Sequence, residues 1–357
     1  MLCSIIPLAS ARTATPAETV FPGKTWTRST PEAQGLDPAP LGKIDALMKK
    51  AKANGVLIRN GYLVAEWNHA GGPETRIDVQ SCGKSITSML LGAAITNGIV
   101  PSLDTKVRDV WPAFDAGKYS DQITFRHLIT MTSGIANTIY GQQFPHYGVV
   151  FPPGKISRYH NNQPYELARA LTYLYDRELT DVLRERLLDP IGAGEIVWNR
   201  YGEVTTKSGR TLPVSEGFGC HQMTARDLAR IGHLYLNDGV WNGKRLLAAH
   251  YVRQTFTDIP QPIIDYRSRA RWHGETAQQR ADDVATLRYS LAWWSRTFYA
   301  RNEWYMSGNG SQFCFLFPAE RIVLTKINNW RNPVQVNHQE FYPLVKAAAK
   351  RPRRAAN

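Results

Sequence analysis

Apolar residues near the start of the chain first recur with the spacing of one helical face and then form strand-like runs. The helical spacing, three or four residues, runs through Ile44, Leu47, Met48 and Ala51. In residues 56–67, two β-prone apolar runs flank Asn60-Gly61, and Asn-Gly in this setting is a strong signal for a β-hairpin. The pattern therefore predicts an amphipathic helix followed by two antiparallel strands.

A second helical stripe begins after Ser81. Its apolar positions are Ile86, Met89, Leu90 and Ala93, which again follow the spacing of one helical face. Asn97-Gly98 supplies a stop signal, because both residue types are favoured where a helix ends. The sequence thus predicts a helix that starts at Ser81 and ends before Gly98.

Residues 99–221 are predicted to form short helices joined by long loops. Three of the expected helices span 124–133 before Gly134, 164–175 from Pro164, and 180–188 before Asp189-Pro190. Beyond this region, Thr224 and Asp227 resemble a capping box that opens one more helix.

Strand-like runs return late in the chain. They cover residues 287–294, 303–306, 312–317 and 322–328, with a turn expected at 318–321. Together with the early hairpin they predict one antiparallel sheet to which both ends of the chain contribute. The predicted fold class is α/β in the α+β arrangement: an antiparallel sheet flanked by helices, with an inserted, mostly helical domain.

This arrangement divides the chain into a few parts. A leader or disordered N-terminus covers 1–25, an α/β domain covers 26–98 and 222–349, a helical domain covers 99–221, and a basic tail covers 350–357. Ala9-Ser10-Ala11 after a short apolar run resembles the end of an export signal, although no basic segment precedes it. We therefore expect a periplasmic or secreted protein, with a cytoplasmic location as the alternative.

The 357 residues carry a formal net charge of +13, and five of the positive charges fall at Lys346 and in the tail. The rest are scattered and no nucleic-acid-binding motif is present, so the sequence argues against a nucleic-acid partner. It also lacks an apolar run of the roughly 18 residues that a membrane helix needs. No expectation about the oligomeric state follows from these features.

The cysteines and histidines do not form a metal-binding pattern. Cysteines stand far apart at positions 3, 82, 220 and 314, and the nine histidines include no H-E-x-x-H motif. We expect neither a disulfide framework nor a metal or other cofactor. Cys82 is predicted to belong to the core.

Ser81 and Lys84 are the first candidates for chemistry. A helix places residues three apart on the same face, and a serine needs an adjacent base before it can act as a nucleophile. The N-terminus of a helix favours developing negative charge, so the Ser81 N–H is a candidate oxyanion donor. The alternative is a surface lysine whose amine reaches solvent.

Tyr159 and Asn161 are the next candidates, in a loop after the turn-rich residues 151–154. A Tyr159 phenolate could take the Ser81 proton and return it to a leaving group, while Asn161 orients Lys84 or a substrate amide. The alternative for Tyr159 is a buried aromatic residue with a bonded hydroxyl. His160, between them, is expected to pack or to face solvent.

With these motifs in order, the sequence resembles the serine β-lactamase and penicillin-binding-protein superfamily, in its class C-like branch of esterases, peptidases and amide hydrolases. The resemblance rests on Ser81-x-x-Lys84 and Tyr159-x-Asn161, and on framework segments at 123–134 and 223–230. It spans nearly the whole chain. It implies a serine hydrolase of the β-lactamase and transpeptidase fold.

The third motif of that family, Lys-Thr-Gly or His-x-Gly, corresponds to Asn309-Gly310-Ser311. By resemblance, the following Gln312 N–H would be the second oxyanion donor. A lysine at the first position typically pairs with the carboxylate of a β-lactam, so Asn309 puts β-lactamase activity in doubt. The alternative is that residues 308–311 are an ordinary turn before a strand.

The resemblance implies acyl transfer through an ester on Ser81, with Lys84 and Tyr159 moving the proton and water completing the reaction. Small carboxylic esters and amides are the first substrate class expected, D-amino-acid peptides the second and β-lactams the third. The polar stretch 266–283 could form a wall of the cleft, or be a solvated loop. A non-catalytic member of the fold, acting as a ligand-binding protein or scaffold, is the alternative function.

Overall fold

A seven-stranded antiparallel sheet lies at the centre of the computed structural model, which describes residues 19–136, 148–219, 221–257, 286–300, 303–332 and 334–349. Its strands are ordered β10-β11-β12-β13-β14-β1-β2. Their bounds are β1 Ala53–Arg59, β2 Tyr62–Asn68, β10 Leu287–Ser290, β11 Trp293–Arg296, β12 Trp304–Gly308, β13 Gln312–Phe317 and β14 Ile322–Asn328. The predicted fold class is confirmed.

The early and late strands of the chain meet at the β1–β14 pair, where Leu57 lies opposite Leu324. The predicted hairpin turn separates β1 from β2, and Asn60 and Gly61 both have positive φ, 53° and 85°. This turn type suits the right-handed twist of a hairpin. Gly61 has a second constraint, because a Cβ there would lie 1.8 Å from the Val20 carbonyl oxygen.

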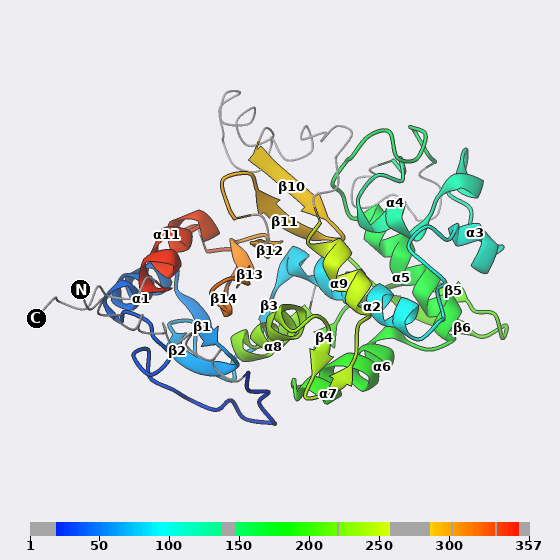
Figure 1. Ribbon diagram of the computed structural model, residues 1–357. Coiled ribbons are helices and arrows are strands. Elements are labelled where there is room, and N and C mark those ends of the chain that lie inside the picture. Colours follow the sequence, from blue (N-terminus) through cyan, green and yellow to red (C-terminus); the bar gives the residue numbers. More distant parts are fainter. Residues whose placement is uncertain are drawn as a thin grey trace, which may run out of the picture.

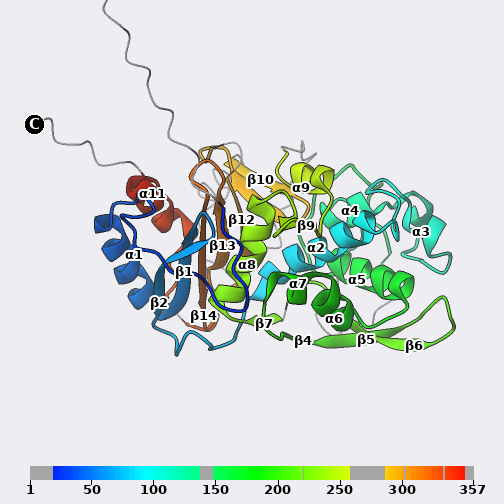
Figure 2. The same cartoon turned by 60° about the horizontal axis from the view of Figure 1, so that its bottom comes forward.

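Helices cover both faces of the sheet (Figures 1 and 2). Helices α1 (Ala39–Lys50) and α11 (His338–Ala349) pack together on one face, and α8 (Ala225–Leu236) packs on the other against β1, β13 and β14. Gly232 brings α8 close to the sheet, because a Cβ there would lie 2.7 Å from Val323 and 2.8 Å from the Cys314 sulfur. The core of the α/β part is therefore a three-layer sandwich.

The remaining elements lie mainly on the α8 side of the sheet, where they form the mostly helical part of the molecule (Figure 1). The helices are α2 Gly83–Thr96, α3 Val107–Val110, α4 Phe125–Ile129, α5 Asn162–Tyr175, α6 Leu179–Leu183, α7 Asp189–Ile191 and α9 Ala249–Thr255, with short turns η1 Gln80–Cys82, η2 Ser120–Gln122 and η3 Arg184–Leu188. Small sheets add β3 Ile77–Asp78, β4 Val197–Trp198, β5 Arg200–Thr205, β6 Thr211–Ser215, β7 His221–Met223, β8 Val240–Trp241 and β9 Lys244–Arg245. The β5–β6 hairpin was not expected in this region.

The three helices predicted within residues 99–221 have different bounds in the structure. The 124–133 segment is helical only over α4, because Met131 adopts a left-handed φ of 63°. Helix α5 begins at Asn162, two residues before Pro164. The 180–188 helix continues through a π-helical turn into α7, which contains Pro190, and it is capped by Gly192 in the left-handed conformation.

The run 287–294 was predicted as one strand, but it forms two strands, β10 and β11, joined by Leu291-Ala292. Both turn residues have positive φ, 40° and 68°, which is costly for residues other than glycine. The Ser85 hydroxyl of α2 donates to the Ala292 carbonyl over 2.7 Å. This contact from a distant segment supports a turn that local sequence does not indicate.

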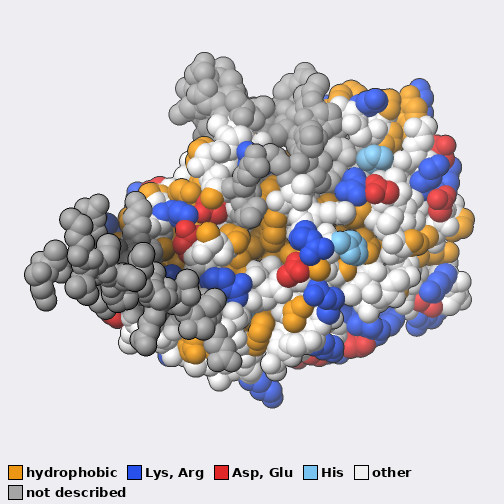
Figure 3. All heavy atoms as spheres, viewed as in Figure 1, with side chains coloured by type: hydrophobic (Ala, Val, Ile, Leu, Met, Phe, Trp, Pro, Cys, Tyr) orange, Lys and Arg blue, Asp and Glu red, His pale blue; other side chains and the backbone are white. Residues whose placement is uncertain are grey.

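The described surface is mixed in charge. On the face shown in Figure 3, lysine and arginine side chains are spread among acidic ones rather than gathered into one area. No helix in the described ranges combines the length and apolarity needed to span a membrane. Residues 19–25, placed by the sequence in the leader, lie against the body through Val20, whose N–H donates to the Asn60 carbonyl over 2.9 Å.

Candidate active site

Ser81 and Lys84 come together at the junction of η1 and α2. The Lys84 amine lies 2.9 Å from the Ser81 hydroxyl and also donates to the Phe218 carbonyl over 3.0 Å. Lys84 is only 1% exposed, so it does not extend to solvent as a surface lysine would. The two side chains therefore lie close together, as predicted. Ser81 belongs to a 3₁₀ turn, however, and the α-helix begins only at Gly83.

The backbone is strained at the residue before Ser81. Gln80 has a φ of +52°, in the left-handed region that non-glycine residues rarely adopt. The Asp78 carboxylate holds this conformation, accepting from the Gln80 N–H over 2.8 Å and from its side-chain amide over 2.7 Å. Burial raises the pKa of Asp78, although the two bonds from Gln80 oppose that shift.

A glycine-flanked segment, residues 217–219, runs beside the start of α2. The Phe218 carbonyl accepts from Lys84, and the Gly217 carbonyl accepts from the Thr87 hydroxyl over 2.7 Å. The two segments approach closely because residue 83 is glycine: a Cβ there would lie 2.8 Å from the Gly219 Cα. The sequence did not predict that residues 217–219 lie beside Lys84, and its only signal for this was the pair of glycines around Phe218.

Tyr159 reaches the same place from the loop before α5. Its ring centre lies 4.9 Å from the Lys84 amine, and the ring packs against Trp294 of β11 with centroids 5.1 Å apart. Asn161 precedes α5 as its N-terminal cap residue. The structure therefore brings the Tyr159 ring to the Lys84 amine, with the rings of Tyr289 and Trp294 packed against it.

His160 points into the protein interior. One ring nitrogen lies 2.9 Å from the Ile135 carbonyl, and the other accepts from the Asn162 N–H over 3.1 Å. Burial lowers its pKa to about 3, so the ring is neutral near pH 7. Of the two expectations for His160, packing is the one that the structure shows.

The third motif forms the turn between β12 and β13, against η1. Gly308, opposite Gln312 in the strand pairing, lies so close to the residue before η1 that a Cβ would be 2.3 Å from the Val79 carbonyl oxygen. In the turn, the Asn309 side chain accepts from the Gly310 N–H over 3.0 Å. The Ser311 hydroxyl bonds to Gln335 and Asn337, at 3.0 and 3.1 Å. The turn is thus built against the segment that carries Ser81.

Comparison with known proteins agrees with this arrangement. The family model described as Beta-lactamase matches residues 42–349. The chain belongs to the Beta-lactamase family. A curated relative, Penicillin-binding protein 4 of Amycolatopsis lactamdurans, is 27% identical over 203 residues, which cover 47% of this chain and 53% of that protein. The match thus spans about half the length of the relative.

Solved structures share the fold of this Beta-lactamase family member. A protein from Bacillus anthracis assigned as a 6-aminohexanoate-dimer hydrolase has a TM-score of 0.67 at 17% identity, covering 91% of this chain and 87% of that one. A penicillin-binding protein homologue from Caulobacter crescentus has a TM-score of 0.65 at 15% identity, covering 88% and 98%. At these identities the likeness is one of fold.

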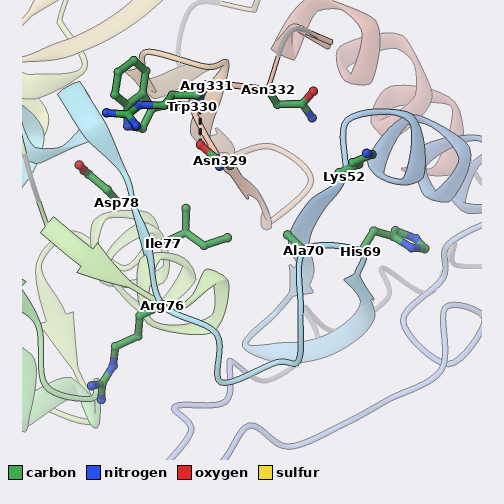
Figure 4. Close-up of a pocket in the computed structure, with 10 residues that line it drawn as sticks. All are labelled: Lys52, His69, Ala70, Arg76, Ile77, Asp78, Asn329, Trp330, Arg331 and Asn332. Carbon is green, nitrogen blue, oxygen red and sulfur yellow. Dashed lines mark hydrogen bonds between the residues drawn. The ribbon is translucent and has the colours of Figure 1, made fainter.

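A pocket of about 670 Å³ lies beside the third motif of this Beta-lactamase family member (Figure 4). Its lining comes from three segments: Lys52, His69 and Ala70; Arg76, Ile77 and Asp78; and Asn329, Trp330, Arg331 and Asn332. Trp330 links it to the turn, because a Cβ on Gly310 would lie 2.4 Å from the Trp330 Cα. Asp78 and Trp330 therefore both line the pocket, and Trp330 is the residue that lies against Gly310 of the turn.

Metal-binding clusters are not found among the residues that the structure describes. Cys82 and Cys314 are buried free thiols, which agrees with the predicted core position of Cys82. Cys3, Cys220, the polar stretch 266–283 and the basic tail 350–357 lie outside the described residues.

Proposed function

We propose that this protein is a serine hydrolase that cleaves a small carboxylic ester or amide through an acyl-enzyme on Ser81. The observation that carries the proposal is the buried Lys84 amine 2.9 Å from the Ser81 hydroxyl. Burial generally disfavours a charged amine, and a neutral amine at hydrogen-bond distance is a competent base for serine. Family membership supports the same chemistry.

In the first half of the reaction, the Ser81 oxygen attacks the carbonyl carbon and its proton passes to Lys84 or Tyr159. The C–O or C–N bond to the leaving group then breaks, and the leaving alcohol or amine receives that proton. In the second half, water gives a proton to the same pair and its oxygen attacks the acyl carbon of the ester. The bond between that carbon and the Ser81 oxygen then breaks, the Ser81 oxygen takes the proton back, and the acid leaves. The Ser81 and Gln312 N–H groups are the proposed donors to the oxyanion.

The third motif ranks the substrates. Asn309 stands where the family's lysine pairs with a β-lactam carboxylate, so we place esters and small amides before D-amino-acid peptides, and β-lactams last. The structural neighbour assigned as a 6-aminohexanoate-dimer hydrolase supports linear amides within the first class. The relative named as a penicillin-binding protein keeps peptides as the second candidate.

The decisive experiment measures hydrolysis of a short-chain p-nitrophenyl ester by the protein and by its Ser81→Ala variant. Activity that disappears in the variant supports the acyl-enzyme, whereas equal activity in both removes Ser81 as the nucleophile. Labelling by a fluorophosphonate separates the rival function, because a non-catalytic binding protein would not be labelled at Ser81. Small amides and D-peptides follow as substrates if the esters are not cleaved but Ser81 is labelled.

A further inference from the structure

Three cationic side chains, those of Lys52, Arg76 and Arg331, line the pocket of Figure 4. In the part of the chain that the structure describes, no carboxylate lies within 4.0 Å of their charged groups. Charges of one sign around a hollow add their fields and raise the local concentration of the opposite ion. A pocket with three such cations is therefore suited to an anion.

The other ionisable groups of the pocket already have partners. Asp78 is the one carboxylate among its described lining residues, and its two oxygens accept from the Gln80 N–H and side-chain amide over 2.8 and 2.7 Å. The His69 ring lies 2.7 Å from a carboxylate oxygen of Asp45. The three cations thus outnumber the acidic group, and they are the groups that remain for a ligand.

One wall of the pocket is close to the nucleophile along the chain. Asp78 precedes Ser81 by three residues, which span at most about 11 Å even when fully extended. Trp330 belongs to the same wall through the third motif, because a Cβ on Gly310 would lie 2.4 Å from the Trp330 Cα. A small substrate held at Ser81 is therefore within reach of this wall.

Arg331 is the cation on that wall. Figure 4 shows Trp330 and Arg331 on the same side of the pocket as Asp78, and Lys52 and His69 on the opposite side. The centre of the Arg331 guanidinium lies 4.9 Å from the centre of the Trp330 ring, and its backbone N–H donates to the Asn329 side chain over 3.0 Å. A guanidinium that stacks on a ring keeps its N–H edge for a carboxylate, which it can bind through two parallel bonds.

We propose that this pocket binds a carboxylate of the substrate and that Arg331 is a specificity-determining residue. The preferred substrates are then small esters or amides that carry a carboxylate away from the bond that is cleaved. This inference rests on the proposed hydrolase function and names the substrate class of the same site.

The test measures kcat and KM for the mono-p-nitrophenyl esters of adipate and suberate and for their methyl esters, which differ by the missing charge. A second pair places the carboxylate on the leaving group: the butyrate ester of p-hydroxyphenylpropanoate and its methyl ester. We expect the wild type to prefer the anion in at least one pair by roughly fivefold or more in kcat/KM. The preference should fall as salt is added, because salt screens the attraction.

Arg331→Met should remove most of this preference by raising KM for the anion at unchanged kcat. A contact away from the reacting carbonyl binds the ground state and the transition state equally, so its loss affects KM. Arg331→Lys should keep part of the preference, since it keeps the charge but not the two-bond geometry. Lys244→Met is the matched control, because it removes one exposed positive charge from β9, which does not line the pocket.

The outcomes separate this inference from the proposed function. Cleavage of the esters with no preference for the anion, or with a preference that persists in Arg331→Met, overturns the carboxylate site and leaves the hydrolase intact. An equal loss for charged and neutral esters in Arg331→Met would show a structural role and also overturns it.

If no ester is cleaved, calorimetry with monomethyl adipate on the wild type and Arg331→Met decides the inference without turnover. Binding that weakens in Arg331→Met supports the carboxylate site even though ester hydrolysis has failed. Absent binding, or equal affinity in the two proteins, overturns the site.

Discussion

Asp78 binds both the backbone N–H and the side-chain amide of Gln80, at 2.8 and 2.7 Å, and so holds the left-handed residue that leads into Ser81. A left-handed conformation costs a non-glycine residue roughly 1–2 kcal/mol. The carboxylate offsets that cost with two hydrogen bonds. The position of the Ser81 hydroxyl therefore depends on a residue three positions earlier that takes no part in the chemistry.

This relationship predicts a coupling between the two positions. Asp78→Ala should destabilise the protein by about 1–3 kcal/mol and lower kcat. In a Gln80→Gly background the same change should cost about 1 kcal/mol less, because glycine needs no support at positive φ. Urea unfolding of the four proteins of this double-mutant cycle measures the coupling. Equal costs in the two backgrounds would show that Asp78 does not support the Gln80 conformation.

Lys84→Met should abolish ester hydrolysis, with a loss of at least about a thousandfold in kcat/KM, because Ser81 loses its base. The melting temperature should change less than the activity, since methionine fills similar space and removes a buried amine. Lys49→Met, at an exposed position of α1, is the matched control and should keep wild-type kinetics. Retention of most activity in Lys84→Met would assign the base to another group.

Gly308→Ala tests the contact between the end of β12, just before the third motif, and Val79, just before η1. The added Cβ would lie 2.3 Å from the Val79 backbone oxygen, so one of the two segments must move. We expect a loss of about 1–3 kcal/mol in the free energy of unfolding and at least a tenfold fall in kcat.

Gly42→Ala is the control for that substitution. Gly42 lies in α1 with nothing within 4 Å of an added Cβ, so alanine should raise the free energy of unfolding by about 0.5–1 kcal/mol. Its activity should not change. If Gly308→Ala were as stable and active as wild type, the close packing of the turn on η1 would be disproved.

Three buried histidines predict how stability depends on pH. Burial lowers the pKa of His160 and His221 to about 3 and that of His233 to about 4. Their unfolded-state pKa is near 6.5, so below that pH the unfolded chain binds protons that the folded chain does not. Stability should therefore be complete above about pH 7 and fall as the pH drops from 6.5 towards 4.

The slope can be checked by urea unfolding between pH 7 and 4. Each histidine contributes up to about 1.4 kcal/mol per pH unit in this range. The His233 ring is buried against the Val20 carbonyl and can take up a proton only when the protein unfolds. His233→Gln removes this ring, so it should remove one histidine's share of the pH dependence of the free energy of unfolding. A free energy of unfolding that is constant from pH 7 to 5 would contradict the assignment of these rings as buried and neutral.

Local signals in the sequence determined much of the fold. Asn60-Gly61 predicted the hairpin because few other pairs accept two positive φ angles, and strands β13 and β14 were predicted with their observed bounds because both are unbroken β-prone runs. The Ser81–Lys84 proximity was also predictable, since helical geometry alone brings residues three apart to one face. Family membership followed from the order of these motifs.

Only the tertiary structure decided the contacts made through backbone atoms and between distant segments. The Leu291-Ala292 turn is supported by the Ser85 hydroxyl, which binds the Ala292 carbonyl, and the Lys84 amine is held by the Phe218 carbonyl. The sequence does not indicate such contacts, because a backbone carbonyl has the same chemistry whatever the side chain of its residue. The same is true of Lys326, which contacts the Ser311 carbonyl only because β13 and β14 pair in one register. The sequence thus determined which side chains are available for catalysis, while packing determined which backbone groups orient them.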